Sequence, residues 1–178
     1  VLSFTLGSAL GILASEFKPV SRFLRPINDT LQTMPLFVLL IPFVMIFKIG
    51  EFTALLAVIA YAMVPAIRYS EHGLRNVPHE VVEAATCMGC TRWQLLWRVK
   101  IPLALPEMMP GLNPTIMFGV SLLVIAALVG TTGPGQQVYI GLGGGDFGVG
   151  MTAGVGMAGI AIISEPMTAA RGVKRYER

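Results

Sequence analysis

Residues 52–67 read FTALLAVIAYAMVPAI, a stretch without a single charged side chain. An α-helix needs about 20 apolar residues to cross a bilayer, and Arg68, which follows directly, can extend its guanidinium to the membrane surface. Similar uncharged runs cover residues 1–15, 30–47, 108–145 and 147–164. The chain therefore consists largely of segments suited to lipid.

The composition of the 178 residues also indicates a membrane protein. Charged side chains make up 13% of the sequence and hydrophobic ones 54%, with a mean hydropathy of +0.70. Soluble domains carry about 25% charged residues, so this composition argues against a water-soluble globular protein. The chain begins at Val1 inside an apolar run without a basic leader, and we expect an N-terminally incomplete fragment rather than a cleaved signal peptide.

We predict an all-α, polytopic transmembrane helix bundle with about five spans. The run at 108–145 is divided into one helix and a glycine-rich loop at 131–147, because glycines and Pro134 interrupt its second half. Gly7 and Gly11, and Gly150 and Gly154, form small-xxx-small pairs that we expect to pack within one subunit, whereas Pro42 and Pro65 allow bends. The predicted spans are residues 1–15, 34–48, 52–69, 112–130 and 148–165.

The basic residues sort onto one side of this topology. With alternating spans, only Lys48 falls on the other side. Basic loops stay in the cytoplasm, so the prediction places 16–33, 70–111 and the C-terminal tail inside, and 49–51 and 131–147 outside. This topology explains the net charge of +3 without nucleic-acid binding. The sorted residues are Lys18, Arg22, Arg25, Arg68, Arg75, Arg92, Arg98, Lys100, Arg171, Lys174, Arg175 and Arg178.

The cytoplasmic segment 76–102 reads NVPHEVVEAATCMGCTRWQLLWRVKIP. Pro78 suits the first turn of a helix, near whose N-terminal end Glu80 and Glu83 are favourable. Apolar residues at helical spacing predict that this short helix is amphipathic, with Gly89 ending it. The apolar residues are Val81, Val82, Ala85 and Met88.

A second short helix is predicted directly after the glycine. Thr91 and Gln94 have the spacing of a capping box, which starts a helix. Pro102 and Pro106 are expected to end it before the next span. Two short helices meeting at a glycine would form a compact projection on the cytoplasmic face, either an ordered loop or a contact site for a soluble partner.

Part of this segment resembles a known motif, the EAA loop of bacterial ABC importer permeases. The matching residues are Glu83, Ala84, Ala85, Gly89, Val99, Ile101 and Pro102, with Val99 and Ile101 as conservative departures. The spacing is highly specific for that superfamily. Residues 1–178 are thus expected to be an importer transmembrane domain with a coupling loop at about 70–111.

Further motifs resemble one branch of these permeases, which carries glycine betaine, proline betaine or choline. The resemblance extends over essentially the whole chain. Departures are Pro110 and Pro114 at the start of the fourth span, and Glu165-Pro166 near the end of the last. The motifs are Gln32-Thr33-Met34-Pro35, Ile49-Gly50, Pro65-Ala66-Ile67-Arg68, Gly73-Leu74, Val77-Pro78, Gly111-Leu112-Asn113 and Gly133-Pro134-Gly135-Gln136.

The resemblance implies the type I ABC importer permease fold and a set of partners. These are cytoplasmic ABC ATPase subunits docked on the seven motif residues, an extracytoplasmic substrate-binding protein, a second permease copy and the membrane lipid of the bacterial inner membrane. The sequence contains no Walker motif, so ATP would be hydrolysed by the partner and the chain itself would not be an enzyme. No cofactor is predicted. No substrate-binding residue is assigned, because in this family the cation–π cage belongs mainly to the binding protein.

Other interpretations of single motifs are weaker. Cys87 and Cys90 form a C-x-x-C pair, but no second pair completes a zinc site, and neither His72 nor His79 has finger spacing. The glycines before Asp146 lack the Gly-Lys-Ser/Thr of a phosphate loop. The remaining alternatives are a permease for amino acids or another small solute, and a secondary transporter or channel. The scarcity of ionisable residues in the spans argues against the last two.

Overall fold

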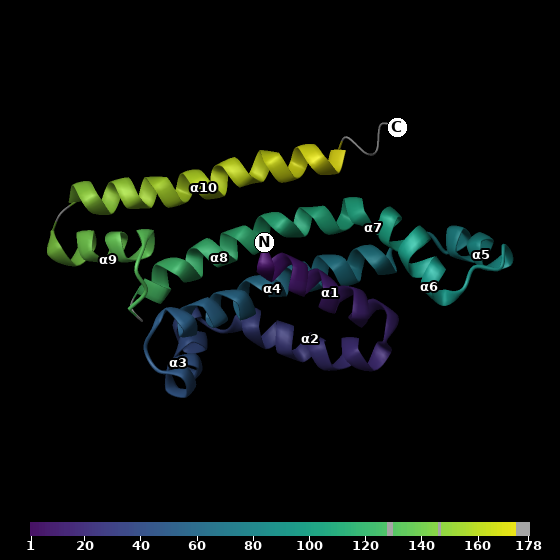
Figure 1. Cartoon of the computed structure of the whole chain (residues 1–178), viewed down its shortest axis with the longest axis horizontal. Coiled ribbons are helices and arrows are strands. Elements are labelled where there is room, and N and C mark those ends of the chain that lie inside the picture. The colour runs from purple at the N-terminus through teal and green to yellow at the C-terminus, as the bar shows by residue number, and fades with distance from the viewer. Residues whose placement is uncertain (128–129, 146, 174–178) are drawn as a thin grey trace.

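All regular elements that the structure describes are helices, which confirms the predicted all-α class (Figure 1). The structure is a computed structural model that describes residues 1–127, 130–145 and 147–173. Lys174, Arg175 and Arg178 of the basic tail lie outside these residues. The helices are α1 (Leu2–Glu16), α2 (Lys18–Thr33), α3 (Leu36–Phe47), α4 (Glu51–Arg75), α5 (His79–Cys87), α6 (Arg92–Gln94), the π-helix η1 (Leu95–Lys100), α7 (Ile101–Met108), the 3₁₀ turn η2 (Met109–Gly111), α8 (Leu112–Ala126), α9 (Pro134–Gly144) and α10 (Phe147–Val173).

Helix α4 is the central element, and α1 packs closely along it. A Cβ atom added at Gly7 would lie 2.6 Å from the carbonyl oxygen of Met63, and one added at Gly11 would lie 2.6 Å from that of Ile67. The two backbones therefore touch where both glycines lie, which confirms packing within one subunit for this pair. Nothing lies within 4 Å of a Cβ at Gly154 on α10, so the same prediction is wrong for that residue.

A hydrophobic core connects α3, α4 and α8. The rings of Tyr61 on α4 and Phe118 on α8 are stacked at 4.9 Å between centroids. Close van der Waals contacts among these side chains fix the neighbouring helices relative to one another. The buried members of this core are Leu39, Leu40, Ala57, Tyr61 and Leu122.

Two helices are long and apolar enough to cross a membrane, among the residues described. They are Glu51–Arg75 and the continuous helix Arg92–Ala126, which contain the predicted spans at 52–69 and most of 112–130. Helices α2 and α3 satisfy the same criterion only together, and they are bent by 110° at residues 34–35, before Pro42. Helix α1 and the apolar part of α10 are shorter apolar helices at the predicted positions 1–15 and 148–165.

The helix from Arg92 to Ala126 corrects the prediction that Pro102 and Pro106 end a short helix. The π-helix η1 widens the backbone just before Pro102, where the Ile101 N–H donates to the Leu96 carbonyl. Pro102 then occupies the first turn of α7, where a missing N–H is tolerated. The chain thus changes its helical pitch at the prolines instead of ending the helix.

The prolines that depart from the family pattern are also accommodated within helices. Pro110 lies in the 3₁₀ turn η2, and Pro114 lies in the first turn of α8. Helix α10 continues through Pro166 to Val173. The local backbone therefore remains helical at all three positions.

The glycine-rich segment predicted as a loop at 131–147 contains the helix α9. Pro134 stands in its first turn and Gly145 ends it in a left-handed conformation with φ of 72°. A Cβ at Gly135 would lie 2.6 Å from the carbonyl oxygen of Leu123, so this glycine lets α9 lie directly against α8. The prediction was wrong because it took every glycine here as a loop residue, whereas Pro134 begins a helix and Gly135 allows close packing against α8.

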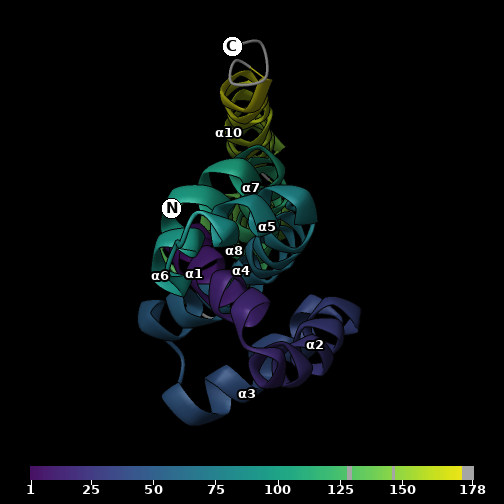
Figure 2. The same cartoon turned by 90° about the vertical axis from the view of Figure 1, so that its right-hand side faces the viewer.

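The helices form an elongated stack (Figure 2). Helix α10 lies along α7 and α8 on one side, α1 and α4 lie below them, and α2 covers the far side. Helices α5 and α6 project at one end, opposite the end that carries α3 and α9 (Figure 1). The predicted cytoplasmic motif is thereby brought to one pole of the molecule.

Candidate functional site

The motif at 83–89 lies on α5, which ends in a specific backbone arrangement. The N–H of Cys90 donates to the Ala85 carbonyl at 3.2 Å, and the N–H of Gly89 donates to the Thr86 carbonyl at 2.9 Å. These two bonds form a Schellman motif, in which the residue after the helix adopts a left-handed conformation. Gly89 has φ of 82°, so the predicted role of this glycine as a helix stop is confirmed.

The predicted capping box begins the next helix. The N–H of Gln94 donates to Thr91 Oγ1 at 3.4 Å, and the N–H of Thr91 donates to Gln94 Oε1 at 3.0 Å. Two backbone donors at the helix start are satisfied in this way. The turn between α5 and α6 is therefore held on both sides by hydrogen bonds.

The faces of α5 differ in exposure. Ala85 is buried, and Val82 is half-buried. Ala84 is exposed, and exposed Glu83 pairs with His79 one turn earlier, with 3.0 Å between Oε1 and Nδ1. Val81 is 38% exposed and Met88 is 79% exposed, so the amphipathic pattern predicted for this helix is confirmed only at Val82 and Ala85. The outer face of α5 thus presents a carboxylate, small side chains and one exposed thioether.

The end of the motif connects the turn to the interior of the bundle. Ile101 packs against a second core formed by Leu74 of α4, Leu96 of η1, and Ala104 and Met108 of α7. Val99 is half-buried and Pro102 is exposed. The structure therefore places all seven motif residues on one segment at the pole, but it divides them between an outer face and an anchor in the core.

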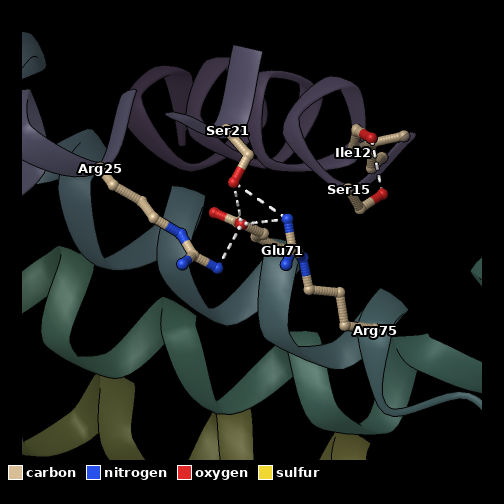
Figure 3. Close-up of polar contacts among 6 residues, drawn as sticks. All are labelled: Ile12, Ser15, Ser21, Arg25, Glu71 and Arg75. Atoms are coloured by element: carbon tan, nitrogen blue, oxygen red, sulfur yellow. Dashed lines mark hydrogen bonds and ion pairs between the residues drawn. The ribbon is translucent and has the colours of Figure 1, made fainter. Parts of the chain in front are cut away.

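A charged cluster beside this anchor was missed by the sequence analysis (Figure 3). Glu71 on α4 is only 7% exposed. Its Oε1 accepts hydrogen bonds from Ser21 Oγ at 2.7 Å and from Arg75 Nη2 at 2.9 Å, and Arg25 Nη2 lies 3.4 Å away. Arg75 also donates to Ser21 at 2.9 Å. The cluster therefore connects α2 to the C-terminal end of α4. On α1 nearby, the Ser15 hydroxyl donates to the Ile12 carbonyl at 2.7 Å (Figure 3).

The signal that could have found this cluster is the spacing of Glu71 and Arg75. Residues four apart lie on one face of a helix, where opposite charges attract. The predicted span ends at residue 69, which leaves both residues in a loop, whereas α4 continues to Arg75. A second ion pair, Arg68 with Asp29, adds to the contact between α2 and α4.

The chemistry of the C-x-x-C pair is limited by its surroundings. Both cysteines are free; Cys87 is exposed and Cys90 is partly exposed. Among the residues described, no group of three or more His, Cys, Asp or Glu side chains is arranged to hold a metal ion. We therefore assign no metal to this segment.

A family model and individual known proteins match this chain, and their descriptions agree with one another. A family model for the binding-protein-dependent transport system inner membrane component matches residues 4–169. The glycine betaine/carnitine transport permease protein of Listeria monocytogenes is 40% identical over 170 residues, which cover 96% of this chain and 60% of the relative. The glycine betaine/proline betaine transport system permease protein of Escherichia coli is 38% identical over 167 residues, which cover 94% and 47%.

Solved structures show the same fold. The methionine ABC transporter in an inward-facing conformation matches with a TM-score of 0.76 at 23% identity, over 96% of this chain and 86% of the other. The chain thus spans about half to three fifths of the length of these two permease relatives and most of the solved chain. On the match over residues 4–169, the chain belongs to the family of binding-protein-dependent transport system inner membrane components.

Proposed function

We propose that the chain is the transmembrane permease part of an ATP-driven importer for betaine-type osmolytes. The relatives that support this substrate class are named for glycine betaine with carnitine, for glycine betaine with proline betaine, and for trimethylamine N-oxide. All of these solutes are small molecules with a fully substituted, methylated nitrogen. The relatives named for choline alone and for glycine betaine, carnitine and choline are both 29% identical over 76% of the chain, so choline falls within the proposed class as well.

Uptake by the reconstituted complex tests the substrate class. The full-length permease, its ATPase and its binding protein are placed in vesicles, and uptake of radiolabelled glycine betaine, carnitine, trimethylamine N-oxide, choline and methionine is compared. We expect ATP-dependent uptake of at least one of the first four. Uptake of methionine alone would contradict the substrate class and leave the importer assignment intact.

The segment 79–102 is, in this proposal, the site that couples the bundle to a partner ATPase. The observation that carries it is the combination described above: a rigidly capped, exposed α5 at one pole, with Ile101 anchored in the core shared by α4 and α7. A contact that moves α5 can thus reach the long helices without a flexible joint. ATP would be bound and hydrolysed by the partner subunit.

The coupling role is tested on the exposed face of α5. Glu83→Lys reverses a charge on the proposed contact surface, whereas Glu80→Lys makes the same change one turn earlier, in the first turn of α5. We expect Glu83→Lys to reduce both uptake and substrate-stimulated ATP hydrolysis about tenfold, and Glu80→Lys to reduce them less. Both variants should insert into the membrane at normal levels. Equal uptake per inserted molecule in Glu83→Lys and wild type would contradict the coupling role.

The same proposal places α5 and α6 in the cytoplasm and pairs the chain with a second copy. Cys87 is exposed, and comparison with a Cys87→Ser variant assigns the labelling to its thiol. A membrane-impermeant thiol reagent should label the protein in inverted vesicles and not in intact cells. Mass measurement of the solubilised complex should give two permease copies. Labelling in intact cells would reverse the orientation, and a transport-active complex with one permease would exclude the dimer.

A further inference from the structure

A groove lies between α1 and the first turns of the long helix, on the side of α1 away from α2. Its volume is about 400 Å³, within the range of sites that hold small ligands. Ile12 and Leu13 of α1 form one apolar wall, and Leu96 of η1 forms part of the other. An aliphatic chain would find apolar contacts on both sides of this groove.

The mouth of the groove carries both tryptophans of the chain. Trp93 is 70% exposed and Trp97 is 57% exposed, with their rings edge-to-face at 6.1 Å between centroids. Tryptophan is enriched at the membrane–water interface, where the ring faces lipid and the indole N–H faces the polar headgroups. The exposed pair therefore marks the depth at which headgroups meet acyl chains.

The charges at the rim favour an anion. Glu16 lines the groove, but its Oε1 lies 2.6 Å from Lys100 Nζ, so its charge is neutralised within the chain. Arg92 also lines the groove, and in the part of the chain that the structure describes no ion pair involves its guanidinium. An apolar groove with one uncompensated cation at its mouth matches an amphiphile with an apolar tail and an anionic head.

We propose that this groove binds an anionic phospholipid, with an acyl chain between α1 and η1 and the headgroup phosphate on Arg92. Its lining includes Arg92, Trp93, Leu96 and Trp97 of the segment proposed for coupling, but no residue of α5. Because the groove borders the first turn after Gly89, a bound lipid would hold α6 against α1. The lipid content of the membrane would then influence the segment that the proposed function assigns to coupling.

Quenching of tryptophan fluorescence tests the site directly. The assembled complex is reconstituted in vesicles whose acyl chains carry bromine on either phosphatidylglycerol or phosphatidylcholine. The signal of Trp93 and Trp97 is isolated as the difference between the wild type and a Trp93→Phe/Trp97→Phe variant. We expect half-maximal quenching at an anionic lipid fraction about fivefold lower than for the zwitterionic lipid, the factor expected for one basic residue at an anionic membrane surface.

Two arginines on neighbouring turns provide a matched comparison. Arg92→Gln should abolish the preference for phosphatidylglycerol, whereas Arg98→Gln, outside the groove lining, should retain it. Raising the salt concentration should weaken the preference in the wild type. This measurement tests the electrostatic attraction between Arg92 and the headgroup even where a variant does not assemble. Equal quenching by both lipids would overturn the proposal in favour of unselective exposure to bulk lipid. Absence of quenching would overturn it in favour of coverage by protein.

Discussion

Glycine serves opposite purposes at the α1–α4 interface and at the α5–α6 turn. At Gly11 a Cβ would lie 2.6 Å from both the Ile67 carbonyl oxygen and the Ser70 Cβ, so the neighbouring helix leaves no room for a side chain. At Gly89 nothing lies within 4 Å of the added Cβ, but φ is 82°. The interior therefore selects glycine for its size and the turn selects it for its backbone. The two regions should respond to different substitutions.

The largest expected effect comes from adding volume at the α1–α4 interface. Gly11→Val would force the two helices apart, and overpacking of this kind costs about 3 kcal/mol. Gly154→Val adds the same side chain to α10, where the structure leaves it open space, and should change stability by less than about 0.5 kcal/mol. The measurement is the midpoint of thermal unfolding of the complex in detergent. Similar midpoints for the two variants would contradict the close approach of α1 and α4.

A smaller effect is expected from the charged cluster between α2 and α4. Glu71→Gln leaves Arg25 and Arg75 without their carboxylate, although their side chains are 59% and 42% exposed and can be hydrated. We expect a loss of roughly 1–3 kcal/mol in the free energy of unfolding.

The matched control is the more exposed ion pair between the same helices. The side chains of Asp29 and Arg68 are 65% and 44% exposed, and an ion pair of this kind contributes at most about 1 kcal/mol. Asp29→Asn should therefore cost less than Glu71→Gln in chemical denaturation of the purified complex. The reverse order would show that the buried carboxylate does not hold α2 to α4.

Features that depend on residues close together in the sequence could be predicted, and features that depend on distant contacts could not. Local backbone chemistry was predictable: the Gly89 stop and the Thr91–Gln94 capping box depend on residues close in sequence, and both are present. The helix class and the positions of the apolar segments followed from hydropathy alone. The resemblance to the family identified the motif at 83–102 that the structure brings to one pole.

The wrong predictions concern prolines, glycines and charged residues whose structural role is set by residues far away in the sequence. Pro102 continues a helix because η1 precedes it, and Gly135 belongs to a helix because α8 lies against it. Glu71 is buried because α2, some 50 residues earlier in the chain, supplies Ser21. Composition cannot show such contacts, so helix ends and buried ion pairs were the least predictable features.

The smallest expected effect is at Gly89, where the left-handed backbone rather than the available volume limits which residue can stand. Asparagine tolerates the left-handed backbone and valine does not, so Gly89→Val should cost roughly 1–2 kcal/mol locally and Gly89→Asn much less. At Gly11 the order of tolerance depends on volume, so asparagine and valine should both be destabilising there. Hydrogen exchange at the Cys90 amide, which donates to the Ala85 carbonyl, is the suitable measurement because the turn can open without unfolding the bundle. Faster exchange in Gly89→Val than in Gly89→Asn, at an unchanged unfolding midpoint, is the expected result. Equal exchange in the two variants would mean that the left-handed turn does not hold the end of α5.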